Sequence, residues 1–313
     1  MFTNDKSKLT TQQIKEIRRI TIWGVGLIGG SLGLALKKNG FRGQRVGLGR
    51  NISRLENALQ HDAVDDATTE LTEGINGSDL IVLCTPVKLI PMLVKRIIES
   101  VIGKEKKQIV VTDVGSTKSS LVQSVEMQVR AVPSSGISFV GGHPMAGSHE
   151  TGVAAARADL FENAKCILTP TKDTDKNALQ LVKNFWEFVG AIPYVCSPVV
   201  HDQLIGAASH LPHLIASILV NSVANVETPN GKALDFTATG FRDTTRIAAG
   251  APELWTSIFT QNADVLLALL DAFSKDLNEF RTFLETHNHA EIERVLVEAQ
   301  DIVTKQRENL QHK

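Results

Sequence analysis

The fold is decided by the stretch Arg19-Ile20-Thr21-Ile22-Trp23-Gly24-Val25-Gly26-Leu27-Ile28-Gly29-Gly30. Its first five residues have the apolar character of a buried strand, and the glycines that follow have the spacing Gly-x-Gly-x-x-Gly. Residues 31–38 then have the pattern of a helix. A strand, a glycine turn and a helix in this order are typical of a dinucleotide-binding unit. A glycine turn that serves only for packing is the alternative.

Each glycine of this motif has a separate predicted role. Gly24 permits the turn, Gly26 lets the backbone approach a pyrophosphate, and Gly29 lets the helix pack closely on the strand. The helix N-terminus adds free N–H groups and a positive dipole end for the phosphates. The predicted cofactor-binding residues of this region are Gly24, Gly26, Leu27, Ile28, Gly29 and Thr85, the last of which directly follows a later strand.

The second strand, Arg45–Leu48, indicates which dinucleotide is bound. Dinucleotide-binding units often carry a carboxylate at the end of this strand for the adenosine ribose, but this chain has Gly49-Arg50-Asn51 there. A carboxylate repels a 2′-phosphate, whereas an arginine attracts one. We therefore expect Arg50 to favour NADP over NAD. The alternative is a solvated surface charge that does not discriminate between the two.

The bulk composition limits the classes of function. The chain has 313 residues, is 42% hydrophobic and has a net charge of −1, which permits two folded domains and disfavours nucleic acid as a partner. Its three cysteines lack metal-ligand spacing and fit a reducing compartment. The segment Met1–Arg19 is polar, and we expect no signal peptide, no membrane-spanning run and a cytoplasmic location.

The first half of the chain alternates strands with helical stretches, such as Leu89–Val101 and Lys176–Val189, and this predicts an α/β domain over residues 1–196 with a parallel sheet. After the glycine motif, strand-length apolar runs occur at Asp79–Cys84, Gln108–Asp113, Ile137–Gly142, Lys165–Leu168 and Ala191–Val195. Ligands bind at the carboxyl ends of the strands in such folds, so the residues after each strand are the candidates for a site.

The second half changes character, and from Val199 onward we expect no strand. Long helices are predicted at 201–226, 235–249, 253–284 and 288–309, with apolar residues at spacings of three and four. So much apolar helix predicts an all-helical domain over residues 197–313 that also forms a homodimer.

Two candidate catalytic residues follow strands of the predicted sheet. Ser116 lies in the strand-to-helix turn Asp113–Lys118, where a helix N-cap is the alternative role. His143 lies between Gly142 and Pro144, and the proline restricts it to extended backbone. A histidine has the near-neutral pKa that proton transfer requires, so His143 is the predicted general base.

The helical half supplies candidate substrate-binding residues. Asp202, Gly206, His210 and His213 have spacings of four, four and three, which predicts a polar stripe on one apolar helix that needs partners or a ligand. Zinc is disfavoured because Pro212 separates the histidines and no further ligand is evident, so we expect no metal.

Arg246 is the candidate for binding an anionic substrate. It lies among small residues, where a guanidinium should face a carboxylate. A local pair with Asp243 is the alternative.

A dinucleotide, a histidine base and an arginine together indicate a dehydrogenase that acts on an alcohol carbon of an acid. The rivals are another NADP-linked hydroxyacid dehydrogenase, for which Lys232 would have to supply the catalytic lysine, and a non-catalytic dinucleotide-binding regulator.

Five motifs in order resemble the prephenate/arogenate dehydrogenase family of tyrosine biosynthesis. They are Gly24–Gly29, Asp113–Lys118, His143–Gly147, Ser209–His213 and Phe241–Ala248. The resemblance implies a nucleotide-binding α/β domain followed by an all-helical dimerisation domain. It also implies oxidative decarboxylation of prephenate to 4-hydroxyphenylpyruvate, or of arogenate to tyrosine, with NAD(P)+ as the hydride acceptor.

The same resemblance assigns roles to single residues. His143 would bind the ring 4-hydroxyl and take its proton, with Ser116 beside it and the nicotinamide. Arg246 and His213 would hold the carboxylate side of the substrate. Many members carry an acidic residue where this chain has His149, so a carboxylate role at that position is not expected.

Overall fold

The computed structural model describes residue 14, residues 16–103, 108–148 and 150–311, and the chain forms two compact units. The first unit ends at Asn262 and the second comprises Ala263–Lys313. This division differs from the predicted boundary after residue 196, because the helices that follow residue 197 group with the α/β domain. The predicted boundary stays a prediction.

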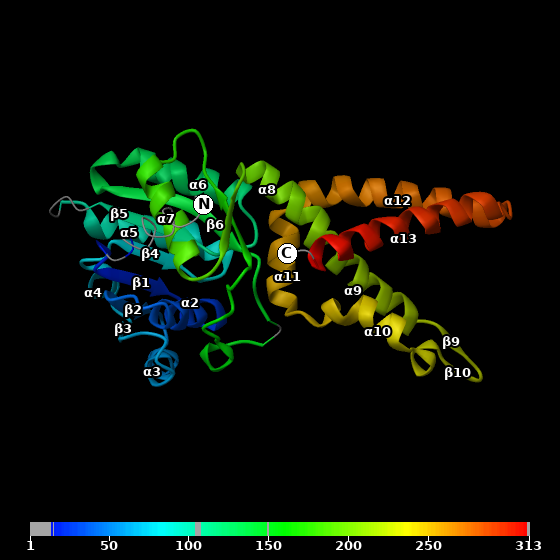
Figure 1. Cartoon of the computed structure of the whole chain (residues 1–313), viewed down its shortest axis with the longest axis horizontal. Helices are drawn as coiled ribbons and strands as arrows, with labels where there is room; N and C mark the ends of the chain where they lie inside the picture. Colours follow the sequence, from blue (N-terminus) through cyan, green and yellow to red (C-terminus); the bar gives the residue numbers. More distant parts are fainter. Residues whose placement is uncertain (1–13, 15, 104–107, 149, 312–313) are drawn as a thin grey trace. The chain divides into compact units, whose positions relative to one another are not determined.

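An eight-stranded sheet forms the centre of the first unit (Figure 1). Its strands are β1 (Arg19–Trp23), β2 (Gln44–Leu48), β3 (Asp66–Thr68), β4 (Leu80–Leu83), β5 (Ile109–Asp113), β6 (Ile137–Pro144), β7 (Lys165–Thr169) and β8 (Ile192–Val195). They lie in the order β3-β2-β1-β4-β5-β6-β7-β8. The predicted α/β class is confirmed, and the strand order reverses between β1 and β4.

Two features of the sheet differ from prediction. Strand β3 was not predicted, because Asp66-Ala67-Thr68 lacks an apolar run and lies at the sheet edge. The sheet is also not fully parallel, because β6 and β7 pair antiparallel. A parallel return requires a long crossover, usually a helix, and the described connection from β6 to β7 contains only the short 3-10 helix Val153–Ala155.

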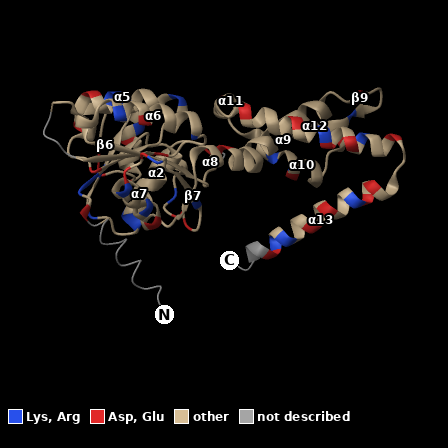
Figure 2. Cartoon of the chain, turned by 90° about the horizontal axis from the view of Figure 1, so that it is seen from above, with Lys and Arg blue, Asp and Glu red and all other residues tan. Residues whose placement is uncertain are grey.

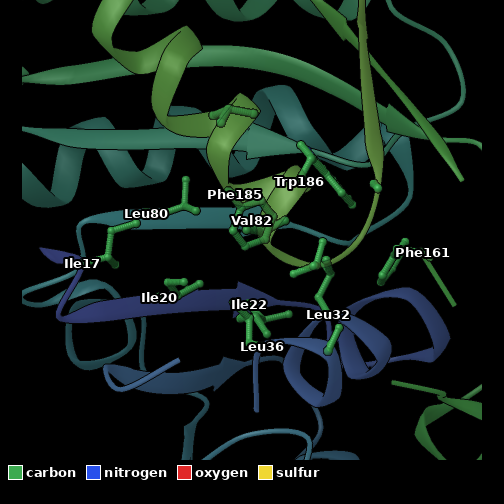
Figure 3. Close-up of a cluster of buried hydrophobic side chains, with 14 of the residues drawn as sticks. Ile17, Ile20, Ile22, Leu32, Leu36, Leu80, Val82, Phe161, Phe185 and Trp186 are labelled. Atoms are coloured by element: carbon green, nitrogen blue, oxygen red, sulfur yellow. The ribbon is translucent and has the colours of Figure 1, made fainter. Parts of the chain in front are cut away.

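Helices cover both faces of the sheet. One face carries α2 (Leu27–Lys38), α3 (Ile52–Gln60) and α7 (Lys176–Phe188), and the other carries α4 (Leu71–Ile75), α5 (Ile90–Val101) and α6 (Ser119–Ala131). Figure 3 shows Ile22 of β1 and Val82 of β4 on the α2 side with Leu32 and Leu36. Their strand neighbours belong to the opposite core, as the two-residue period of a strand requires.

The helix after the glycine loop begins earlier than predicted. The pattern suggested Ser31 as its start, but α2 begins at Leu27 with Gly26 as its N-cap. The first turn therefore lies within the glycine motif, and Leu27 and Ile28 are its first residues.

The helical part of the first unit begins at α8 (Pro198–Ile205), which continues through a π-helical segment (Gly206–His210) into α9 (Leu211–Ala224). It starts three residues before the prediction because Ser197 caps it and Pro198 occupies its first position. The expectation of no strand is wrong, since a hairpin of β9 (Glu227–Thr228) and β10 (Gly231–Lys232) follows.

The remaining helices are shorter than predicted. The predicted helix at 235–249 is α10 (Thr239–Thr245) followed by a 3-10 helix, η6 (Arg246–Ala249). The predicted helix at 253–284 is divided at Asn262 into α11 (Pro252–Gln261) and α12 (Ala263–Glu285). Asn262 has non-helical backbone angles, and its side chain is engaged elsewhere, as described below.

The second unit consists of α12 and α13 (His289–Gln311), which contact each other after a turn in which His287 has φ 49°. Leu267 and Leu277 of α12 are each 60% exposed. Figure 2 shows both charge signs along α13, whereas α9 carries no charged residue.

The expectation of no membrane-length apolar run needs correction. The continuous helix Pro198–Ala224 has 27 residues and a mean hydropathy of 1.4, which meets the length and composition of a membrane span. Its buried side chains include Asp202, His210 and His213, which belong to the site described next. Only 28% of its apolar stretch is buried in the single chain, so length and composition alone are weak evidence for a membrane span.

Candidate functional site

The glycine loop has the geometry that close packing requires. Gly24 has φ 102°, and a Cβ there would lie 2.6 Å from the Cys84 carbonyl oxygen. A Cβ on Gly29 would collide with the Gly24 carbonyl and lie 2.9 Å from Ile22 Cγ2. Beside Gly26, by contrast, there is open space. The loop is therefore tight where it meets the strand and open where a ligand would approach.

Around this loop the chain fits a bound dinucleotide. The crevice where strand order reverses, between β1 and β4, is the place where such folds bind cofactors. The amides of Leu27 and Ile28 begin α2, and the N-cap Gly26 has no side chain to occupy them. Thr85, beside Gly24, has a buried hydroxyl that finds no hydrogen-bond partner among the described residues. An orphaned hydroxyl of this kind is suited to a ligand.

At the end of β2, Arg50 is exposed. The next residue, Asn51, caps α3 by accepting a hydrogen bond of 3.0 Å from the Arg54 amide. Among the described residues no ion pair involves Arg50, whereas the nearby Arg45 is buried and pairs with Asp65. The Arg50 guanidinium is thus open to a ligand or to solvent.

His143 lies in β6 itself, and its buried ring belongs to a chain of hydrogen-bonded groups. Its Nδ1 lies 2.8 Å from Nε2 of His201, and Nδ1 of His201 lies 2.8 Å from Oδ1 of Asp202. His201 and Asp202 both come from the first turns of α8 and are buried. The extended backbone predicted for His143 is confirmed, since it pairs with Ile167 of β7.

Asp202 also closes the N-terminus of α6. Its Oδ1 accepts a hydrogen bond of 2.8 Å from the Lys118 amide, and its Oδ2 accepts one of 2.8 Å from the Ser119 amide. A cap supplied by another helix therefore replaces the cap that Ser116 would have given, and the alternative role of Ser116 as N-cap is wrong. Within the described residues Ser116 has no recorded hydrogen bond, so its catalytic and cofactor roles stay predictions.

Besides the contact of His201 with Asp202, the site contains a fully buried ion pair between Lys118 and Asp113. Lys118 Nζ and Asp113 Oδ2 form a short contact, and the same carboxylate accepts hydrogen bonds from the amides of Gly115 at 2.7 Å and Gly142 at 3.1 Å. A Cβ on Gly115 would lie 2.8 Å from this carboxylate. The pair fixes the loop after β5 to the residue before His143.

Burial sets the charge state of the histidines. It holds the pKa of His143 well below its usual range, and the neighbouring His201, Lys118 and His210 act in the same direction. Burial also lowers the pKa of His201, although Asp202 opposes this shift. For Asp202, burial alone would raise the pKa, but hydrogen bonds from His201 and the α6 amides bring it below its usual value. Both rings are therefore neutral beside an ionised carboxylate.

The residues of the polar stripe in the helical half are buried, and they have different surroundings. Asn262 Nδ2 donates to the Asp202 carbonyl at 3.0 Å and lies 3.0 Å from His210 Nδ1. Burial lowers the pKa of His210 to about 4. His213 stacks on Trp255 with ring centroids 3.5 Å apart, and burial lowers its pKa as well. The π-helical segment follows Asp202, ends at His210 and precedes His213, and such segments are frequent at functional sites.

Arg246 lies at the surface of the single chain. It is exposed, at the start of the 3-10 helix η6, which packs against α9. Because solvent reaches the guanidinium in the single chain, its surroundings do not by themselves require a carboxylate partner. No ion pair between Arg246 and Asp243 occurs within the described ranges, so the alternative of a local pair is not supported either. Lys232 is also exposed and pairs with Glu227 at 3.5 Å in the β9–β10 hairpin.

Sequence reasoning missed His201, Asn262 and Trp255. A signal for His201 was present, since it directly precedes Asp202 and follows a Ser-Pro helix start. Trp255 and Asn262 have no local signal, because their roles depend on how α11 meets α9. His149 lies outside the described residues. In the part of the chain that the structure describes, no cluster of three or more His, Cys, Asp or Glu side chains could hold a metal ion.

Comparison with known proteins shows the family that the chain resembles. Residues 32–195 match the nucleotide-binding domain of prephenate dehydrogenase, and residues 197–298 match its dimerization domain. Prephenate dehydrogenase of Bacillus subtilis is 36% identical over 90% of this chain and 74% of its own length.

Two solved structures extend the similarity to the whole fold. One is prephenate dehydrogenase from A. aeolicus in complex with hydroxyphenyl propionate and NAD+, with a TM-score of 0.82 and 33% identity over 94% of this chain and 98% of that one. The other is Synechocystis arogenate dehydrogenase, with a TM-score of 0.78 and 31% identity over 92% and 99% of the two chains.

A dinucleotide-binding α/β domain with a buried neutral histidine at the carboxyl end of its sheet defines an NAD(P)-dependent dehydrogenase. The chain belongs to the prephenate dehydrogenase family. The resemblance and the predicted fold class are thereby confirmed, and the two rival interpretations, a different hydroxyacid dehydrogenase and a non-catalytic regulator, are not supported.

Proposed function

We propose that the protein oxidatively decarboxylates prephenate, or its amino counterpart arogenate, in tyrosine biosynthesis, with hydride transfer to NAD(P)+. The observation that carries this proposal is the neutral, buried His143 at the carboxyl end of β6, the same sheet edge that bears the glycine loop after β1. Membership of the family supplies the substrate class.

In the proposed reaction His143 removes the proton of the ring 4-hydroxyl through Nε2. Nδ1 is already engaged with His201, which leaves Nε2 for the substrate. A bound nicotinamide supplies the acceptor for the hydride that leaves the same carbon. The ring carboxylate then departs as CO2, and its electron pair completes the aromatic ring. Base assistance of this kind is typically worth about 10²–10⁴-fold.

Substrate binding is assigned to Arg246, His213 and His210. The Arg246 guanidinium is exposed and charged, and suits a carboxylate. His213, held flat against Trp255, offers an orienting ring, while His210 meets the same Trp255 edge-on and is held by Asn262. Ser116 is proposed to lie beside the nicotinamide.

The test is a spectrophotometric assay of reduced cofactor with prephenate and with arogenate. The two substrates differ only in the side-chain amine, so the ratio of their kcat/KM values gives the specificity directly. We expect turnover with at least one of them and CO2 release in equal amount. Absence of cofactor reduction with both substrates would contradict the proposal.

NADP preference is proposed to come from Arg50. Arg50→Ala should raise the KM for NADP more than that for NAD, because only NADP carries the additional phosphate. Arg42→Ala, an exposed arginine on the turn before β2, is the matched control. A strong preference for NAD in the parent enzyme, or equal losses for both cofactors, would contradict this assignment.

A cytoplasmic homodimer is the proposed assembly. Residues 197–298 match the dimerization domain of prephenate dehydrogenase. Apolar side chains such as Ile218 of α9 and Leu277 of α12 are more than half exposed in the single chain. Such faces are suited to a second copy of the chain. Sedimentation equilibrium should give twice the mass of the chain.

A further inference from the structure

We propose that His201 and Asp202 are positioning residues for His143, which hold its ring as the Nδ1–H tautomer so that Nε2 carries the free lone pair. The inference rests on the proposed role of His143 as the base. The geometry that carries it is the unbroken series Asp202 Oδ1, His201 Nδ1, His201 Nε2 and His143 Nδ1, with contacts of 2.8 Å at both ends.

The positions of the protons on both histidine rings follow from the Asp202 carboxylate, which cannot donate a hydrogen bond. An ionised carboxylate only accepts hydrogen bonds, so His201 donates to Asp202 through Nδ1–H. In a neutral ring the other nitrogen is then an acceptor, and His201 Nε2 accepts from His143 Nδ1–H. Neutral His143 must therefore carry its lone pair at Nε2, the atom that a general base uses.

Asp202 is anchored through both carboxylate oxygens and through its backbone carbonyl. Its two oxygens accept the amides of Lys118 and Ser119 at the positive end of α6, and Asn262 holds its backbone carbonyl. The helix dipole and three charge-assisted hydrogen bonds favour the ionised form. Because this carboxylate is fixed and ionised, His201 can adopt only one neutral tautomer beside it, and this in turn leaves only one neutral tautomer for His143.

The arrangement also prepares the site for the proton that His143 receives. When Nε2 takes the substrate proton, the ring becomes a cation in a buried position, which is costly without compensation. A protonated His201 would disfavour this cation and lower the pKa of His143, whereas neutral His201, hydrogen-bonded to Asp202, accepts from Nδ1–H of the cation and reduces the cost. A carboxylate that orients a catalytic imidazole acts in this way in hydrolases, where the amide variant costs about 10⁴-fold because it imposes the wrong tautomer.

Three variants separate orientation from folding. Asp202→Asn keeps one acceptor oxygen, which can still bind the Ser119 amide, but its NH2 then takes the place of Oδ1, gives up the bond from the Lys118 amide and presents a donor to His201 Nδ1, which would reverse the tautomers of both rings. His201→Ala removes the acceptor for His143, and His201→Gln restores an acceptor near the same position. We expect Asp202→Asn and His201→Ala to lower kcat at least about tenfold with KM values for substrate and cofactor nearly unchanged. His201→Gln should recover much of the loss, and His61→Gln, an exposed histidine, is the control.

The tautomer can be read without any substrate. Nitrogen-15 NMR of histidine-labelled protein, with His143→Asn used to assign the signals, should show His143 with a protonated Nδ1 and a bare Nε2. In Asp202→Asn the His143 Nδ1 signal should become that of a nitrogen without a proton, and the Nε2 signal that of a protonated nitrogen. A wild-type His143 protonated at Nε2, or an unaltered spectrum in the folded Asp202→Asn variant, would overturn the proposal.

The same measurements distinguish this proposal from the proposed function. If the enzyme turned over neither substrate but the NMR result held, the reaction would be wrong and the positioning pair right. If turnover were normal in both Asp202→Asn and His201→Ala, the positioning pair would be wrong and the reaction unaffected. Thermal denaturation of each variant identifies one that has lost its fold, and His201→Ala leaves the Asp202 cap of α6 in place.

Discussion

At the residue scale, the charge state of His143 decides whether it can accept a proton. A solvent-exposed imidazole is partly protonated near pH 6.5, but burial and the neighbours His201, Lys118 and His210 hold the pKa of His143 well below this value. The ring is therefore neutral across the physiological range. The cost of burying it is offset by the hydrogen bond to His201.

His143→Asn is expected to lower kcat by about 100-fold or more while the dissociation constant of the dinucleotide stays near the parent value. The substitution removes the base but leaves the glycine loop after β1 intact. Stopped-flow measurement of a single turnover and fluorescence titration with the reduced cofactor give the two quantities. A variant that kept most of its kcat would refute the assignment.

Arg246→Ala is expected to raise the KM for the carboxylate substrate by at least about tenfold, which corresponds to roughly 1.4 kcal/mol or more. Arg246 is exposed and unpaired within the described residues, so no protein partner competes for its guanidinium. Arg242→Ala, an exposed arginine on the preceding helix, is the control for a general loss of positive charge. An unchanged KM at saturating cofactor would make Arg246 a surface residue only.

The chemistry of single residues was the part of the site most accessible from the sequence. His143 could be selected because a histidine between glycine and proline at a strand end has few structural reasons to be there. His201 was missed although it directly precedes Asp202, because its importance lies in a contact between β6 and α8, 58 residues apart in the chain. The exposure of Arg246 could not be predicted from its small neighbours, because these lie on a short 3-10 helix with no buried residue.

At the scale of elements, the glycine loop and α2 illustrate how one motif serves both packing and binding. Gly29 is needed because a side chain there would strike the Gly24 carbonyl and Ile22. A Cβ on Gly26 would meet no heavy atom within 4 Å, so packing does not require glycine there, and we expect the requirement to come from a ligand. Two glycines three residues apart thus have separable functions.

The pair Gly26→Ala and Gly29→Ala tests this separation. Gly29→Ala should lower the melting temperature, because overpacking typically costs about 1–3 kcal/mol. Gly26→Ala should melt near the parent temperature but bind the dinucleotide at least about tenfold more weakly, since a methyl group would occupy the phosphate approach. Calorimetric titration and thermal denaturation of both variants give the answer. A Gly26→Ala protein with parental affinity would contradict the predicted cofactor contact.

Helix and strand boundaries were predicted well where a local signal exists. The helices α5 and α7 and most of the strands follow from apolar patterning and flanking turn residues. The division at Asn262 and the π-helical segment do not, because both arise from contacts of Asp202 and His210 with another helix. Tertiary contacts override helix propensity at these two points.

At the scale of the whole molecule, the buried histidines link stability to pH. His143, His201, His210 and His213 all have pKa values lowered by burial. When the chain unfolds, each returns to its ordinary value near 6.5 and binds a proton more readily. Below pH 6.5 the unfolded state therefore binds more protons than the folded state, and stability falls as the pH is lowered.

We expect the melting temperature to be nearly constant between pH 8 and 7 and to fall steadily from about pH 6.5 downward, at fixed protein concentration so that any dimerisation contributes equally. His210 alone, with a pKa of about 4, contributes a loss of roughly 3 kcal/mol between pH 6.5 and 4. Its protonation would also turn Nδ1 into a donor facing the Asn262 amide and break that contact. His210→Gln should make the decline shallower, whereas His61→Gln, at the surface, should leave it unchanged. A melting temperature independent of pH between 7 and 5 would mean that the histidines are not buried in the neutral form, and the argument for His143 as a ready base would fail with it.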